Sequence, residues 1–263
     1  MEKECIINRV PHIIALYWLI KIASTTLGET GADMFSFTFN FGYLETIGIF
    51  FSIFLVSLWI KLSMNGYHPT MYWITFTTSA IAGTAISDFI DRTLGLGYLT
   101  GSIILLALLL ITLFLWYKKE GDISVETITT YHAELYYWIA FLFANTLGTA
   151  LGDYVADELG LGFKESAIII GSILVLLAFL HFFTKISWIV LFWLAFVLTR
   201  PFGASFGDLF TKPLEHGGLA LGTIGASSVF AIILMIGLYK ETKLEKQRIK
   251  IEVLKSPLFL FQY

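Results

Sequence analysis

Four aspartates carry most of the chemistry that this sequence offers, because they recur at equivalent places in a fourfold repeat. Each lies fifteen residues after a tryptophan, with a mostly apolar stretch between the two. The pairs are Trp18 and Asp33, Trp73 and Asp88, Trp138 and Asp153, and Trp193 and Asp208. A carboxylate in an apolar span is costly, so it faces protein or water. Four at one depth form a ring that repels itself unless it shares protons or holds a cation.

Further polar residues lie within two helical turns of this ring. Glu29 precedes Asp33 by one turn, while Asn145 and Arg200 each lie two turns before the aspartate of their own copy. Oxygen ligands of this kind suit hard cations such as Mg²⁺, Ca²⁺ or Mn²⁺. We predict an ion site made of the four aspartates, assisted by Glu29 and Asn145. Arg200 would tune its charge or gate it, and reaches Glu29 if the first and fourth copies are neighbours.

A purely structural role for the aspartates is the alternative. Each could cap the helix that follows, or accept hydrogen bonds from loop amides beside a glycine-containing turn. A scaffold residue would be repeated four times just as a ligand would. The sequence leaves both interpretations open.

Three histidines give a weaker indication of a second, inner site. His12, His68 and His132 lie 20 or 21 residues before the aspartate of their copy, and the fourth copy has Ser187 there. Imidazoles gathered at the inner mouth could bind a transition metal. Hydrogen bonding at the membrane boundary is the alternative.

Small residues follow each tryptophan at a spacing typical of close helix packing. The first of each pair is a glycine, and the second, four residues later, is also small: Gly28 and Ala32, Gly83 and Ser87, Gly148 and Gly152, Gly203 and Gly207. Such faces let helix backbones approach closely in lipid. The four repeat helices are therefore predicted to form an inner bundle that brings the aspartates together. The tryptophans would anchor the helices at the membrane interface or line a ligand path.

The elements that must position these residues are membrane-spanning helices. The chain has 263 residues, of which 57% are hydrophobic and 14% charged, whereas a soluble domain carries about 25% charged residues. We expect an all-α membrane protein whose spans lie near 11–33, 44–60, 71–91, 99–117, 135–156, 165–184, 186–208 and 219–239. A span needs about 20 apolar residues, and these segments lack the alternation of barrel strands.

Spacing divides the eight predicted spans into four tandem hairpins and two duplicated halves. The aspartates are separated by 55, 65 and 55 residues, which predicts pseudo-fourfold or twofold symmetry about the membrane normal. The predicted segments are a first half (1–117, hairpins 11–60 and 71–117), a linker (118–134), a second half (135–239, hairpins 135–184 and 186–239) and a basic tail (240–263). The tail would begin as a helix and then either lie on the inner membrane surface or be disordered.

Charge sets the predicted orientation. Twelve Lys and Arg residues lie on the side of both termini and three on the other, so both termini are expected in the cytoplasm of a multipass inner (plasma) membrane protein. A net charge of −3 is too small to imply nucleic acid, and the single Cys5 excludes an intrachain disulfide. No catalytic motif or nucleophile–base pair can be placed, so an enzyme is not expected.

At these residues the chain resembles a bacterial family of multipass membrane proteins built from a tandem repeat of unknown function. In that family each repeat has two transmembrane segments and a characteristic tryptophan, a pattern matched by Trp18, Trp73, Trp138 and Trp193 over residues 11–239. The resemblance implies an architecture and brings no activity, substrate or cofactor.

The function expected from the residues is therefore a transporter or channel for a cation, with a divalent metal favoured. A proton-coupled carrier of a small solute, and a scaffold or partner subunit that transports nothing, are the alternatives. The lipid bilayer and a small cation or solute are the expected partners, and assembly into an oligomer is left open.

Overall fold

The computed structural model describes residues 8–125, 128–216 and 218–255, and the regular structure within these ranges is entirely helical. Eight long α-helices follow one another: α1 (Ala15–Asp33), α2 (Tyr43–Ser63), α3 (Pro69–Asp88), α4 (Tyr98–Glu120), α5 (Tyr131–Asp153), α6 (Phe163–Phe183), α7 (Trp188–Thr211) and α8 (Gly222–Lys255). The predicted all-α class is confirmed.

Six of these helices are long and apolar enough to cross a membrane, which makes the chain a multipass membrane protein. They are α2, α4, α5 with the turn that follows it, α6, α7 and most of α8. The helices α1 and α3 fall short of that criterion, since both are rich in Ser, Thr and Gly and α1 also carries Lys21 and Glu29. Both are largely buried by their neighbours, so their surfaces need not be apolar.

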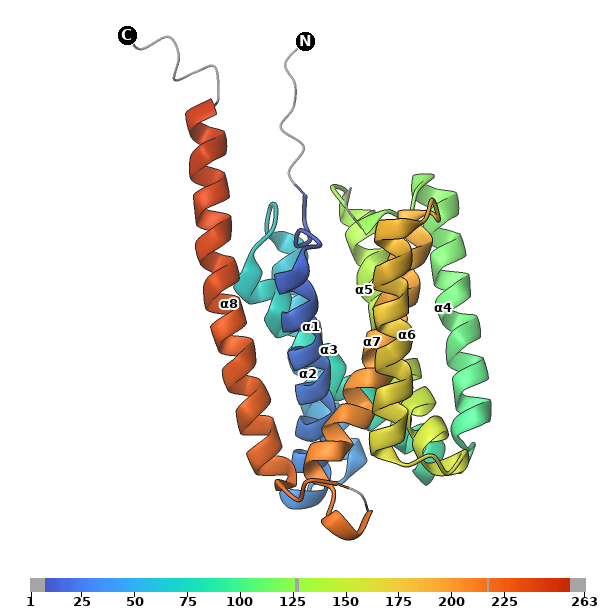
Figure 1. The fold of residues 1–263 in the computed structure, drawn as a ribbon. Coiled ribbons are helices and arrows are strands. Elements are labelled where there is room, and N and C mark those ends of the chain that lie inside the picture. The colour runs from blue at the N-terminus through green and yellow to red at the C-terminus, as the bar shows by residue number, and fades with distance from the viewer. Residues whose placement is uncertain (1–7, 126–127, 217, 256–263) are drawn as a thin grey trace.

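The helices form an inner and an outer set. The inner helices α1, α3, α5 and α7 contact one another in that order, and α7 returns to α1 to close the ring. Each outer helix packs mainly on the inner helix that comes next in the sequence, so α2 lies on α3, α4 on α5 and α6 on α7. The last helix, α8, packs along α1 on one flank of the bundle (Figure 1).

A π-helical turn follows the aspartate in each of the first three hairpins. These turns are η1 (Met34–Thr38), η2 (Phe89–Thr93) and η4 (Tyr154–Glu158). The next helix then starts from a glycine with positive φ, which is +81° at Gly42, +73° at Gly97 and +77° at Gly162. A side chain at these three glycines would strain the turn. Gly217, the corresponding residue of the fourth copy, lies outside the described residues.

The eighth helix is longer than the predicted span 219–239. It continues without a break to Lys255 and projects past the ends of the other helices (Figure 1), which confirms that the tail begins as a helix. The expected course of the tail after this helix concerns residues 256–263, which lie outside the described residues. The sequence explains the long helix, because no Gly or Pro interrupts the Lys- and Glu-rich stretch after Gly237. Glu241 fixes the helix to its neighbours by accepting hydrogen bonds from Trp73 Nε1 at 2.5 Å and Tyr67 Oη at 2.7 Å.

A buried charge clamp joins three distant segments at the end of the bundle where α1 begins. Glu134 of α5 pairs with Arg9 and, at 2.6 Å, with Lys61 of α2. Arg9 also donates to the carbonyl oxygens of Leu62 and Met64. The side chains of Glu134 and Lys61 are fully buried. The clamp therefore connects the segment before α1 to α2 and α5 inside the protein.

The tryptophan of the repeat is a core residue in three of the four copies. Trp73, Trp138 and Trp193 are at most 7% exposed and belong to a continuous aromatic core, and only Trp18 is partly exposed. The interfacial-anchor interpretation is therefore wrong for these three. The physical reason is that protein surrounds their rings. Trp73 donates to Glu241 of α8, Trp138 packs against Tyr72 of α3, and Trp193 packs against Trp116 of α4.

Candidate functional site

The axis of the inner bundle is filled by side chains that recur every four residues along each inner helix. Counted from the repeat tryptophan, they occupy positions −1, +3, +7, +11 and +15, which we call the axial positions. From the end where α1 begins, the layers are Tyr17, Tyr72, Tyr137 and Phe192; Lys21, Phe76, Phe141 and Phe196; Thr25, Ala80, Asn145 and Arg200; Glu29, Thr84, Thr149 and Ala204; and Asp33, Asp88, Asp153 and Asp208. None of these residues is more than 5% exposed, so the axis holds no open channel along its described length.

The glycines predicted to bring the inner helices together do so. Each lies against the residue at axial position +7 of the next helix in the ring: Gly28 against Ala80, Gly83 against Asn145, Gly148 against Arg200 and Gly203 against Thr25. The second small residues Gly152 and Gly207 also lie in close contact, with Ala204 and Glu29 respectively. A Cβ atom at Gly28 would lie 2.7 Å from the Ala80 Cβ, well inside van der Waals contact.

Two basic residues cover the ring of aspartates and join it in pairs. Arg92 of η2 lies 3.5 Å from Asp88 and 2.9 Å from Asp153. Lys212, directly after α7, lies 3.2 Å from Asp208 and 3.4 Å from Asp33. Each base therefore links the aspartate of its own copy to that of the next.

The same two bases are the part of this cluster that reaches solvent. Their side chains are 36% and 31% exposed, whereas those of the four aspartates are at most 7% exposed. Burial lowers the pKa of Lys212, but the attraction of Asp208 and Asp33 outweighs burial and leaves that pKa raised. Lys212 is therefore held in its charged form over the carboxylates.

Glu29 and Arg200 form a second ion pair one layer below the ring. Arg200 Nη1 lies 3.3 Å from Glu29 Oε2, so the contact expected between the first and fourth copies is present. The guanidinium also donates to the Thr25 carbonyl oxygen at 3.2 Å and to the Thr84 hydroxyl. Thr84 and Thr149 donate to Glu29 at 3.3 and 3.5 Å, so Glu29 is bound from all sides of the axis.

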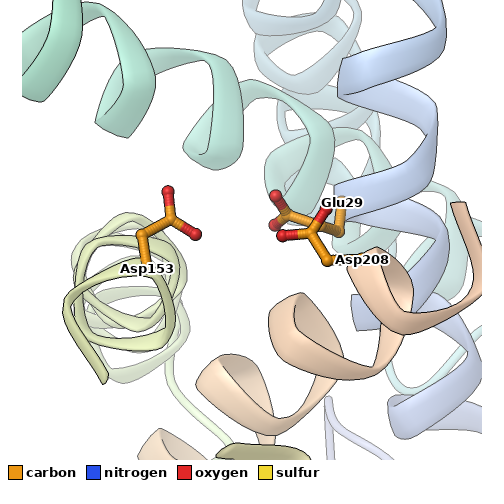
Figure 2. A group of neighbouring side chains, drawn as sticks. All are labelled: Glu29, Asp153 and Asp208. Atoms are coloured by element: carbon orange, nitrogen blue, oxygen red, sulfur yellow. The ribbon is translucent and has the colours of Figure 1, made fainter. Parts of the chain in front are cut away.

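Three carboxylates come close enough to share one ion. Oxygens of Glu29, Asp153 and Asp208 all lie within 4.8 Å of one another, and all three residues are buried. Figure 2 shows Asp153 directed from α5 across the axis toward the other two, which come from α1 and α7. The other two aspartates are joined to this group through a base. Asp33 shares Lys212 with Asp208, and Asp88 shares Arg92 with Asp153.

Helix capping does not account for the aspartates. The first three each end an α-helix directly before a π-helical turn, and Asp208 lies near the end of α7. None of the four carboxylates accepts a hydrogen bond from a backbone amide of the described residues. Their partners among the described residues are the side chains of Arg92 and Lys212. Asn145, predicted to assist, instead donates its amide to Ser79 at 3.1 Å.

The predicted inner histidine site does not form. His12 and His132 are exposed and His68 is half-buried, where it contacts the carbonyl oxygen of Asn65. Among the described residues, the acidic group above is the one set of three or more such side chains whose ligand atoms converge. The histidines precede or begin their helices at the rim of the bundle, so equal spacing in sequence does not bring them to the axis.

Sequence reasoning missed Arg92 and Lys212. A signal was present, because each lies four residues after an aspartate and the two are 120 residues apart, as are Asp88 and Asp208. The spacing i, i+4 places a base beside an acid on the same helical face. They occur in the second and fourth copies only, which is the alternation that a duplicated pair of hairpins predicts.

A cavity of about 710 Å³ lies apart from this cluster, on the flank of the bundle between α1, α6 and α7. Its lining is mainly apolar and includes Trp18, Phe192 and Trp188. None of the ring carboxylates lines it. The acidic cluster is therefore closed off within the inner bundle rather than open to this cavity.

The fold and the site together define a class, namely a helical multipass membrane protein whose tandem hairpins enclose a buried cluster of acids and bases. The chain belongs to the family described as "Repeat of Unknown Function (DUF347)", which matches residues 16–67, 71–122, 136–187 and 191–245. The four matched segments coincide with the four hairpins. No curated protein and no solved structure matches the chain.

Proposed function

We propose that this protein is an integral membrane transporter for a cation, with a divalent metal as the favoured cargo. The observation that carries the proposal is the convergence of Glu29, Asp153 and Asp208 within 4.8 Å in a buried site. Carboxylate oxygens at this spacing could bind one Ca²⁺- or Mn²⁺-sized ion with bonds of about 2.1–2.6 Å after small rotations of the side chains. Metal cations of this hardness prefer oxygen ligands.

The charge of the cluster favours a divalent ion. Its five carboxylates are the four ring aspartates and Glu29, and its three bases are Arg92, Arg200 and Lys212. With all of them ionised the cluster carries two uncompensated negative charges. One divalent cation neutralises that excess, and uncompensated charge in a membrane interior is costly.

The bases suggest how access is controlled. Arg92 and Lys212 pair with the ring carboxylates from the solvent side and are themselves part-exposed. A cargo cation entering from that side would displace these side chains from the carboxylates. Each also lies near an aromatic ring at the start of an outer helix, with Arg92 5.9 Å from the ring of Tyr98 and Lys212 5.8 Å from that of Phe163. These rings offer the displaced bases a second favourable position.

The membrane arrangement belongs to the same proposal. We infer that all eight helices cross the bilayer, with α1 and α3 carried by their neighbours, and that the two halves are related by a pseudo-twofold axis along the membrane normal. The excess of Lys and Arg at the end where α1 begins and α8 ends supports cytoplasmic termini in the inner (plasma) membrane. The acidic ring then faces the outer side.

The test is metal uptake by purified protein in liposomes. Wild-type protein should take up Mn²⁺, Ca²⁺ or Mg²⁺, and the double variant Asp153→Asn with Asp208→Asn should lose that uptake because two of the three converging carboxylates lose their charge. Asp157→Asn is the matched control, since Asp157 is exposed and close in sequence to Asp153. Equal uptake by the double variant and wild type would refute the assignment.

A proton-coupled carrier of a small organic solute is the second candidate. The site carries both charge signs, because each of the three converging carboxylates has a base within 4 Å. Such a site also suits a solute that bears a positive and a negative group, which favours this candidate. Solute uptake driven by a pH gradient and indifferent to metals would select it. A protein that binds and moves nothing, and whose aspartate variants only unfold more easily, would instead be a scaffold.

A further inference from the structure

Lys21 stands out among the axial residues. At its position, three residues after the repeat tryptophan, the other three copies have Phe76, Phe141 and Phe196. The lysine is 1% exposed. Its Nζ lies 3.4 Å from the ring centre of Phe196, 5.2 Å from that of Phe76 and 5.6 Å from that of Phe141.

No carboxylate pairs with this ammonium group. Among the described residues Lys21 has no ion pair and no hydrogen bond from Nζ, and its partners are the faces of the three rings. The acids of the site begin two turns away at Glu29, which is bound to Arg200. A charged amine buried without a counter-ion is expensive, and releasing a proton removes that cost.

We propose that Lys21 is the proton-exchanging site of the transporter, and that a cation bound at the acidic cluster and a proton on Lys21 exclude each other. This inference rests on the proposed cation transport and adds its coupling ion. The structure supplies the link through Glu29, which is shared between Arg200 and the three-carboxylate group.

The exchange follows from the charges along the axis. Arg200 occupies the axial layer next to that of Lys21, so the two positive charges repel each other. Glu29 offsets part of that repulsion while it is paired with Arg200. When Glu29 turns to the cargo cation, Arg200 loses its partner, and the Lys21 ammonium gives one proton to water and becomes a neutral amine. Linkage is reciprocal, so a proton returning to Lys21 weakens cation binding by the same factor.

Hydroxyl groups lie on the side where the proton would leave. One turn below Lys21 are Tyr17 on its own helix, Tyr72 on α3 and Tyr137 on α5, and the last two hydroxyls are 2.5 Å apart. All three are buried. The acids near this end are already engaged, Glu241 on α8 by Trp73 and Tyr67 and Glu134 on α5 by Arg9 and Lys61. The tyrosine hydroxyls are therefore the groups left to relay the proton.

The test compares Mn²⁺ binding by the full-length protein in detergent at a series of pH values. If Lys21 gives up one proton per ion bound, wild-type affinity should rise about tenfold more per pH unit than that of Lys21→Met. Lys164→Met, which changes an exposed lysine, should keep the wild-type slope. Lys21→Phe, which installs the residue of the other three copies, serves if the methionine variant does not fold.

The outcomes separate this inference from the proposed function. A slope reduced by one proton in Lys21→Met or Lys21→Phe supports the exchange. An unchanged slope overturns it while leaving cation binding intact, and assigns Lys21 to packing alone. Wild-type protein that binds no Mn²⁺ overturns both, and binding that survives in Asp153→Asn with Asp208→Asn overturns only the assigned ion site.

Discussion

The contact between α1 and α3 at Gly28 allows a quantitative test of the inner bundle. A methyl group at residue 28 would lie 2.7 Å from the Ala80 Cβ and 3.2 Å from the Ala80 carbonyl carbon. The first distance is about 0.8 Å short of the ~3.5 Å at which carbon atoms attract. Neither atom belongs to a flexible side chain, so the two helices themselves must separate.

The expected cost of Gly28→Ala follows from that geometry. Overpacking costs about 1–3 kcal/mol, and the rigid neighbour places this site near the upper limit. Replacing a helical Gly by Ala returns up to about 1 kcal/mol, which leaves a net loss of about 2 kcal/mol. At roughly 2–4 °C per kcal/mol for a chain of this size, the unfolding temperature in detergent should fall by about 4–8 °C.

Two further variants make the assay decisive. Gly48→Ala is the matched control, because Gly48 is exposed on α2 and a Cβ there would meet nothing within 4 Å. It should keep or slightly raise the unfolding temperature. Combining Gly28→Ala with Ala80→Gly moves the methyl group across the interface and should recover most of the loss. If Gly28→Ala unfolds at the same temperature as Gly48→Ala, the close approach of α1 and α3 is refuted.

Two buried polar contacts outside the axis give further tests by thermal unfolding. Trp73→Phe removes the hydrogen bond to Glu241 and should cost about 1.5–3 kcal/mol more than Trp138→Phe, whose indole nitrogen has no hydrogen-bond partner in the described part of the chain; equal losses would show that the bond contributes nothing. Glu134→Gln leaves the two bases of the charge clamp without an acid and should cost about 3–5 kcal/mol, whereas Glu245→Gln, in a part-exposed pair, should change nothing measurable.

The sequence predicts the inner bundle well because each copy repeats the residues that make its helix contacts. Equal spacing from tryptophan to glycine to aspartate places equivalent residues at equal heights, and the glycines mark the faces that touch. The contact between Arg200 and Glu29 follows in turn, since it requires only that the first and fourth copies be neighbours. These features depend on periodicity, which a single sequence displays directly.

Other features depend on partners that periodicity does not identify. The spacing does not reveal which segments surround the repeat tryptophans, so it predicts Trp73 and Trp138 at a lipid interface although protein covers them. The histidines share a spacing but stand at the rim, where no close contact fixes them. Arg92 and Lys212 lie in or next to the turns after the aspartates, and the repeat spacing does not predict that these turns fold back over the ring.

The packing of α8 on α1 has a consequence for the order in which the protein is made. Inner helix α1 carries Lys21 and Glu29 and is too polar to cross a membrane by composition alone. Its neighbours α7 and α8 are the last helices to be synthesised. The earliest helix is thus the last to be enclosed, and more than 150 residues must be translated before its charges find their partners. During biogenesis this polar helix must wait, in the insertion machinery or beside α3, until the ring closes.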